Sequence, residues 1–134
     1  MSKILNISEA ASIAVHGIIL VARSDKLVNV NYIAELTASS RHHVAKVFQR
    51  LVKEGFINSS RGPSGGFSLK MAPEDISFLD IYESIEGKII ITKCPLDKPI
   101  CPFEKCIFQN VITDLTLEFR TYMEEQTLDK YLDY

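Results

Sequence analysis

The sequence has only three cysteines and no apolar run long enough to cross a bilayer. Its longest apolar stretch, residues 13–22, is interrupted by His16 and Gly17, and neither a basic segment nor a cleavage site flanks it. A membrane span needs about 20 apolar residues, so this stretch predicts no membrane association. An odd number of cysteines without a secretion signal argues against a disulfide framework. We expect a cytoplasmic protein whose cysteines serve metal or thiol chemistry.

Signatures of enzymes are also missing. The chain carries no phosphate-binding Walker loop, no dinucleotide fingerprint and no pairing of a nucleophile with a base. Internal repeats and low-complexity tracts are absent as well. With 134 residues, 46% of them hydrophobic, the chain is long enough for one domain with a core and one appended element. The sequence therefore predicts a protein that is not an enzyme.

Residues 57–70 read I-N-S-S-R-G-P-S-G-G-F-S-L-K, which is two short strand patterns joined by a glycine-rich loop. This pattern is typical of a β-wing. Gly62, Gly65 and Gly66 can adopt positive φ without steric cost, and we expect Arg61 to project a charge toward whatever the hairpin touches. An ordinary surface hairpin is the alternative for this segment alone. The candidate contacts with a DNA minor groove are Arg61, Gly62, Pro63, Ser64, Gly65 and Gly66.

The segment before the wing predicts two helices separated by a turn at residues 37–40. Ser39 or Ser40 is a suitable N-cap for the second helix. Its apolar positions follow the helical period and are Val44, Val47, Phe48 and Leu51. Its opposite face is basic, and the candidate contacts with bases and phosphates there are Ser40, Arg41, His42, His43 and Lys46. Helix, turn, basic helix and wing in this order predict a winged helix-turn-helix that binds double-stranded DNA.

Charge is distributed unevenly along the chain. The formal net charge is −2, but residues 31–70 carry +4, residues 71–134 carry −7 and residues 1–30 carry +1. A basic module on an acidic remainder can bind phosphates locally while the acidic part faces away. The charge pattern therefore agrees with a local DNA interface, although a chance fluctuation of surface charge is the alternative.

Two amphipathic helices are expected after the wing. The first lies within residues 73–86 and ends at Gly87, with Ile76, Leu79, Tyr82 (or Ile81) and Ile85 on one face. The second carries a stripe of apolar residues at helical spacing, namely Phe108, Val111, Ile112, Leu115, Phe119, Tyr122 and Met123. A domain this small has little surface left to cover such a stripe. We expect the second helix to pair with its copy in a homodimer, which would bind a pseudo-palindromic operator.

Cys94, Cys101 and Cys106 lie in a proline-rich segment between these two helices, with the spacing C-x6-C-x4-C. Three thiols this close suit a soft metal or an iron-sulfur cluster. The absence of C-x-x-C gives little support to a zinc ribbon. Structural or purely redox-active thiols are the alternative.

These motifs together resemble the Rrf-type winged-helix transcriptional regulators, the family that includes IscR, NsrR and CymR. The resemblance covers nearly the whole chain, and R-G-P-S-G-G-F at residues 61–67 and the cysteine segment are its most specific parts. It implies a mainly α fold with a small β-wing, in which a long C-terminal dimerisation helix follows the winged helix-turn-helix domain. We divide the chain into a DNA-binding domain at 1–87, a cysteine-rich sensor loop at 88–106, and a dimerisation helix with its tail at 107–134.

The resemblance also implies a cofactor. In cluster-binding members three loop cysteines hold a 2Fe-2S or 4Fe-4S cluster, so Cys94, Cys101 and Cys106 are the matching ligands here. Their spacing departs from the more even spacing usual in the family, which leaves the cluster type open. A fourth ligand can come from the first helix of the partner subunit. The candidates are His16, Ser12 and Glu9, of which we favour His16 because imidazole binds iron and a histidine among isoleucines is an unusual choice for an apolar face.

The expected function is that of a DNA-binding transcriptional regulator, a repressor that senses redox state, nitric oxide or iron-sulfur status. Two alternatives remain open. One is a cluster-free repressor of cysteine metabolism, controlled by thiol oxidation or by a partner protein. The other is a small carrier of metal or thiols in which the winged helix contacts protein, and it predicts no salt-dependent binding to duplex DNA.

Overall fold

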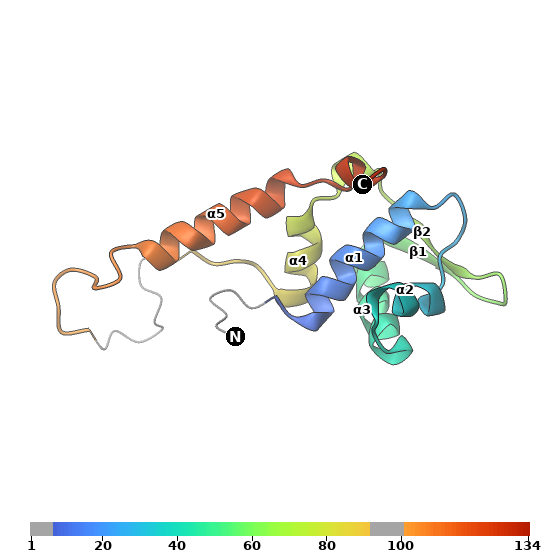
Figure 1. Ribbon diagram of the computed structural model, residues 1–134, viewed down its shortest axis with the longest axis horizontal. Coiled ribbons are helices and arrows are strands. Elements are labelled where there is room, and N and C mark those ends of the chain that lie inside the picture. The colour runs from blue at the N-terminus through green and yellow to red at the C-terminus, as the bar shows by residue number, and fades with distance from the viewer. Residues whose placement is uncertain (1–6, 92–100) are drawn as a thin grey trace.

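The computed structural model describes residues 7–91 and 101–134. It confirms the expected fold class, because most elements are helices and a small two-stranded sheet projects at one end (Figure 1). In chain order the elements are α1 (Glu9–Arg23), α2 (Val30–Thr37), α3 (Arg41–Lys53), β1 (Ile57–Ser60), β2 (Gly66–Leu69), the 3-10 turn η1 (Pro73–Asp75), α4 (Phe78–Glu86), α5 (Val111–Glu125) and the 3-10 turn η2 (Leu128–Tyr131).

Helix α1 crosses the middle of the molecule and packs against α2, α3 and α4 (Figure 1). Ser8 caps its start, since the Ser8 hydroxyl accepts a hydrogen bond of 3.0 Å from the Ala11 amide. The side of α1 that faces α3 carries Gly17. A Cβ added at Gly17 would lie 2.5 Å from Cζ of Phe48, so only glycine allows the two helices to approach this closely.

The helix-turn-helix consists of α2 and α3. The turn depends on Ala38, whose φ of 52° is left-handed, and α3 starts after Ser40. Ser40 is the N-cap, because its hydroxyl accepts from the His43 amide at 3.1 Å. All four residues predicted for the core face of α3 are buried, namely Val44, Val47, Phe48 and Leu51. The helical period therefore identified the packed face of α3 correctly.

The wing is an antiparallel hairpin in which Ile57 pairs with Leu69 and Ser60 pairs with Gly66. Gly62 and Gly66 have the expected positive φ, at 104° and 156°. Gly65 does not adopt positive φ. Gly65 is instead required for space, because a Cβ there would lie 2.3 Å from the Ser60 carbonyl oxygen.

The expected helix after the wing is divided in two. Pro73 opens the short turn η1, and α4 starts separately behind a capping box in which Ser77 and Asp80 each accept the other's backbone N–H. Leu79 and Ile81 are buried in α4, and Ile76 is buried in the link before it. Tyr82 meets Phe119 of α5 edge to face at 5.5 Å, and burial there, with help from the Glu86 carboxylate, raises the pKa of Tyr82.

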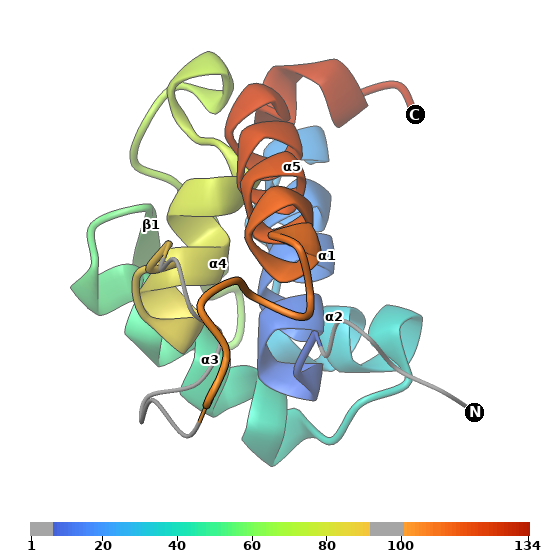
Figure 2. The same ribbon diagram turned by 90° about the vertical axis from the view of Figure 1, so that its left-hand side faces the viewer.

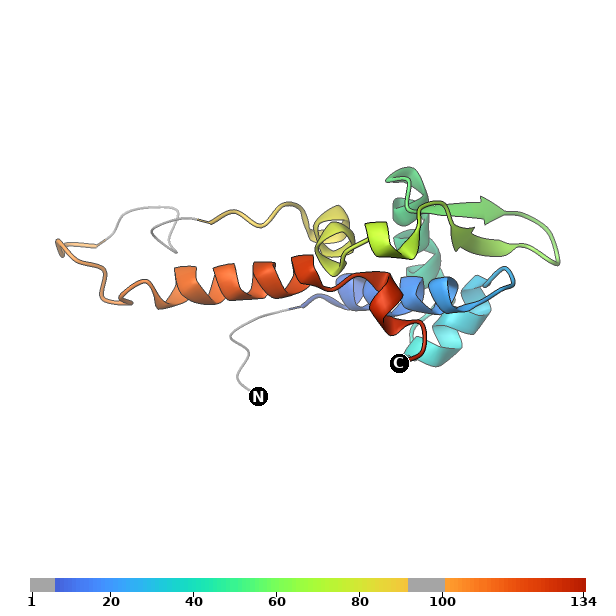
Figure 3. The same ribbon diagram turned by 90° about the horizontal axis from the view of Figure 1, so that it is seen from above.

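Helix α5 extends away from the rest of the fold, and only its C-terminal part contacts α4 (Figures 2 and 3). The chain then returns to the winged helix through η2. The Leu128 amide donates to the Ile76 carbonyl at 3.1 Å, and the Phe78 amide donates to the Gln126 carbonyl at 2.7 Å. Leu128 is fully buried in the common core, a role that sequence analysis did not foresee. Among the described residues, no helix is long and apolar enough to cross a membrane.

The close approach of α1 and α3 gives a first prediction. Gly17→Ala should lower the free energy of unfolding by about 1–3 kcal/mol, because the new methyl group overlaps the Phe48 ring and the helices must separate. Urea denaturation followed by circular dichroism measures this change. Ser12→Ala, on the same helix, is the control and should change stability by less than about 0.5 kcal/mol. Equal stability of the Gly17 variant and wild type would contradict the packing described here.

Candidate DNA interface and cysteine segment

One row of polar side chains runs along the side of α3 that faces away from the core. His42, Lys46, Gln49 and Lys53 follow one another at steps of four, three and four residues, and all four are exposed. All four are hydrogen-bond donors of the kinds that contact bases and phosphates. Sequence analysis did not include Gln49 among the DNA contacts, although the same spacing that selects His42 and Lys46 also selects Gln49.

The other basic residues of α3 lie on its flanks and contact neighbouring elements. Arg41 reaches Asn31 of α2, with Nη1 donating to Oδ1 at 3.5 Å. Arg50 reaches α4, where its Nε donates to the Ser84 carbonyl at 3.1 Å. The His43 side chain contacts α1 instead. These side chains tie α3 to the fold on both flanks and leave the middle row facing outward.

The tip of the wing is exposed, including Arg61, Gly62, Pro63 and Ser64, whereas Gly65 and Gly66 are half-buried. The wing is anchored at its base, because Val28 and Phe67 exchange two backbone hydrogen bonds of 2.8 and 3.1 Å. A polar cleft of about 350 Å³ separates the wing from the start of α2, and Asn29, Asn31, Ser59 and Ser60 help to line it. The wing and the exposed row of α3 both belong to residues 31–70, which carry a net charge of +4.

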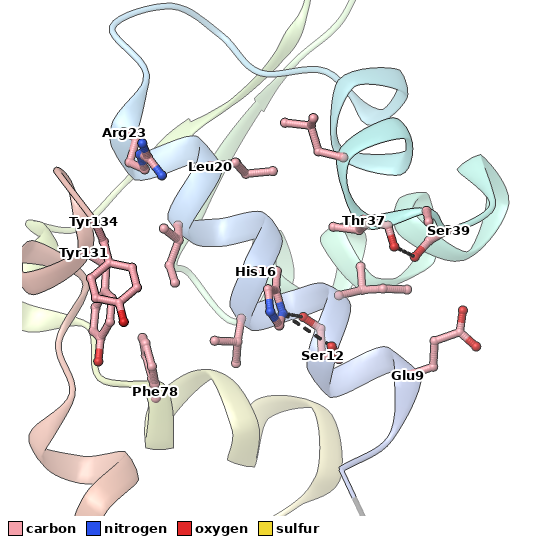
Figure 4. Close-up of a pocket in the computed structure, with 15 residues that line it drawn as sticks. Glu9, Ser12, His16, Leu20, Arg23, Thr37, Ser39, Phe78, Tyr131 and Tyr134 are labelled. Carbon is pink, nitrogen blue, oxygen red and sulfur yellow. Dashed lines mark hydrogen bonds between the residues drawn. The ribbon is translucent and has the colours of Figure 1, made fainter.

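The candidate fourth ligands lie on α1, along an open groove of about 710 Å³ between the α2–α3 turn and the C-terminal tail (Figure 4). His16 is exposed in this groove, and the core side of α1 consists instead of residues such as Ile13 and Ile18. The His16 Nδ1 lies 2.7 Å from the Ser12 carbonyl oxygen. A carbonyl only accepts, so Nδ1 carries the proton and Nε2 of the neutral ring keeps a lone pair that can bind a metal.

Residues 101–110 lie at the opposite end of the molecule from the wing, beyond the N-terminus of α5 (Figures 1 and 3). Cys101 is exposed and Cys106 is half-buried, and both are free thiols. Cys94 lies outside the described residues. Within the described ranges no three potential metal ligands come together, so α1 and the described cysteines of one chain do not form a common site.

Among the described residues, little covers the apolar stripe expected for α5, and the first member of this stripe, Phe108, lies just before the helix. Met123 is buried and Phe119 packs on Tyr82, but the rest of the stripe is exposed, comprising Phe108, Val111, Ile112, Leu115 and Tyr122. Leu117, which lies off the stripe, is exposed as well. The helix that follows the cysteine segment therefore presents a continuous apolar surface.

Comparison with known proteins yields a match over most of the chain. A family model described as Rrf2, an iron-dependent transcriptional regulator, matches residues 7–134. The chain is also similar to the HTH-type transcriptional regulator NsrR of Bacillus subtilis (strain 168), with 31% identity over 108 residues, which are 79% of this chain and 74% of the relative. A putative HTH-type transcriptional regulator of Haemophilus influenzae is 31% identical over 102 residues, covering 75% of this chain and 67% of that one.

Solved structures show the same fold. CymR, the global cysteine regulator of B. subtilis, superposes with a TM-score of 0.80 over 98% of both chains, at 21% identity. IscR of T. potens superposes with a TM-score of 0.75 over 96% of this chain and 86% of its own, at 23% identity. At these identities the likeness establishes the arrangement of helices and wing.

Proposed function

The chain belongs to the Rrf2 family of transcriptional regulators, and on this premise we propose that it is a DNA-binding repressor whose affinity is set by a cysteine-ligated iron-sulfur cluster. The observation that carries the DNA-binding part is the exposed row His42, Lys46 and Gln49 on α3, in the same basic part of the sequence as the arginine-tipped wing. Such a regulator works in the cytoplasm, where the chromosome is accessible to it.

In this proposal α3 enters the major groove. His42, Lys46 and Gln49 present donors to base edges and phosphates, while Arg61 at the tip of the wing enters the adjacent minor groove. The remaining sequence-based candidates, Ser40, Arg41 and His43, act from the flank of α3 or hold its start in place. Gly62, Pro63, Ser64, Gly65 and Gly66 shape the wing so that its backbone can approach the sugar-phosphate chain closely.

The regulator acts as a homodimer. The exposed stripe of α5 is too apolar to remain in water, and an identical stripe on a second copy is the surface most suited to cover it. Two-fold symmetry would then present two copies of α3 to two half-sites of a pseudo-palindromic operator.

The chemistry of the donor set fits an iron-sulfur cluster. Cys101 and Cys106 are free thiols at the exposed end of the molecule, and Cys94 would be the third thiolate ligand. A bound 2Fe-2S or 4Fe-4S cluster would supply a centre that reacts with oxidants and nitric oxide. The α1 residues lie away from Cys101 and Cys106 of their own chain, so a fourth ligand from α1 would come from the partner subunit. His16 is the preferred residue because its Nε2 can bind a metal, ahead of Ser12 and Glu9.

A cluster-free repressor is the second candidate. One observation favours it, namely that the thiols of Cys101 and Cys106 are accessible to oxidants without any metal. The fold likeness to CymR, whose description is that of a global cysteine regulator, is compatible with this candidate. In that case the thiols themselves, or a partner protein, would control the spacing of the two reading helices.

Binding to duplex DNA gives a second prediction. Lys46→Ala should reduce the slope of log K against log salt by about 1, because one phosphate contact is lost. Arg61→Ala should weaken binding and should relax the preference for particular base pairs at the DNA positions that the wing contacts. Fluorescence anisotropy over a salt series measures both effects, with Lys130→Ala in η2 as the control. A wild-type protein without salt-dependent binding would contradict the DNA-binding proposal and favour the carrier.

The uncovered stripe of α5 gives a third prediction. Leu115→Glu should weaken dimerisation by about 100-fold or more, since each subunit loses a buried leucine worth at least about 1.5 kcal/mol. Sedimentation velocity at micromolar concentration should then show a monomer of 15.1 kDa in place of the dimer. Glu118→Gln, on the same helix but off the stripe, should remain dimeric. If the Leu115 variant also stays dimeric, α5 is not the dimer interface.

The cluster gives a fourth prediction. Protein purified without oxygen should absorb visible light and contain iron and acid-labile sulfide, and Cys101→Ser should lose both features. His16→Ala should retain iron but show a shifted spectrum if Nε2 is the fourth ligand. Arg23→Ala, at the other end of α1, serves as the control. A colourless anaerobic protein that still binds duplex DNA would support the cluster-free repressor instead.

A further inference from the structure

His43 differs from its neighbours on α3 because an acidic residue holds it. Its Nδ1 lies 3.5 Å from Oε1 of Glu9, the first residue of α1. The His43 side chain is 35% exposed and that of Glu9 is 69% exposed, so the pair lies at the rim of the interface between α1 and α3. Glu9 is thus an acidic group placed directly beside the N-terminal half of the helix that would read DNA.

The position of Glu9 is set by a second polar contact. Ser8 caps α1 and also donates its hydroxyl hydrogen to the Glu86 carboxylate, at the last residue of α4. The chain leaves the fold directly after Glu86 toward the cysteine segment, and the Glu83 carboxylate accepts the Ile89 amide at 2.8 Å at this exit. Glu86, Ser8, Glu9 and His43 therefore connect the start of that segment to α3.

We propose that Glu9 is a positioning residue that restrains DNA binding by holding His43 on the flank of α3. This inference rests on the proposed DNA-binding function. Two effects act in the same direction. The carboxylate repels phosphates near the N-terminal half of α3, and His43 cannot donate to a phosphate from Nδ1 while that nitrogen faces Glu9. The contact between Ser8 and Glu86 keeps Glu9 in the position that exerts this restraint.

The test uses metal-free, reduced protein at one fixed pH, so that the result is independent of any cluster. The probe is a fluorescein-labelled duplex of mixed sequence, and anisotropy gives its affinity over a salt series. Glu9→Gln should raise the affinity about threefold, in line with the energy of an exposed ion pair, and steepen the salt slope by up to about 0.9. Glu9→Asp keeps the carboxylate and should remain close to wild type.

The decisive measurement repeats the Glu9→Gln substitution in a protein that also carries His43→Ala. The gain from Glu9→Gln should be smaller in this variant, because the release of His43 can no longer contribute and only the loss of charge repulsion remains. Glu86→Ala should produce a smaller gain, which disappears when Glu9 is already glutamine. Glu74→Gln, which removes the same charge from η1, is the matched control and should leave binding unchanged.

The outcomes separate the two proposals. A full gain that persists with His43→Ala, or no gain at all from Glu9→Gln, would overturn the positioning role of Glu9 while leaving DNA binding intact. A gain of equal size from Glu74→Gln would show that net charge alone is responsible, and would also overturn it. Failure of the wild type to bind duplex DNA in a salt-dependent way would overturn the DNA-binding function itself, and the inference with it.

Discussion

The approach of α1 to α3 at Gly17 and Phe48 is the contact on which the other parts of the fold depend. The Phe48 ring occupies the space that a side chain at residue 17 would take, and it also packs on Phe67 of β2 with ring centroids 4.9 Å apart. One buried aromatic ring therefore joins the central helix, the helix expected to read DNA and the base of the wing. Because protein interiors are close-packed, a shift of α1 would displace both DNA-facing elements, α3 and the wing.

The two ends of the molecule have different chemistry. The wing lies at one end of the long axis, and residues 101–110, with Cys101 and Cys106, lie at the other, beyond α5 (Figure 3). Packed helices link these two ends. Helix α5 packs on α4 through Tyr82 and Phe119, η2 fastens the end of α5 to Ile76, and α4 meets α3 at Arg50. Within the described residues, these packed helices offer one route by which a change at Cys101 or Cys106 can reach α3.

Local patterns in the sequence predicted most of the helices and the wing. The apolar positions of α3 repeat with the helical period, so their common burial follows from helix geometry alone. Ser40 is a short polar residue before a helical stretch. The side chain of such a residue accepts a hydrogen bond from a backbone amide in the first turn of the helix. The sequence also predicted that one small domain has too little surface to cover the apolar stripe of α5. Most of this stripe is exposed in the structure.

Contacts between residues far apart in the chain could not be predicted in this way. No local pattern indicates that His43 meets Glu9, that Leu128 returns to the core, or that Gly65 is needed because of the Ser60 carbonyl. His16 looked unusual among isoleucines, yet the orientation of α1 places it in an open groove. The residue types and their spacing thus established the elements, the family resemblance and the candidate chemistry. Which of those residues face DNA, and which face one another, depends on how the helices pack, because packing brings together side chains that the sequence keeps apart.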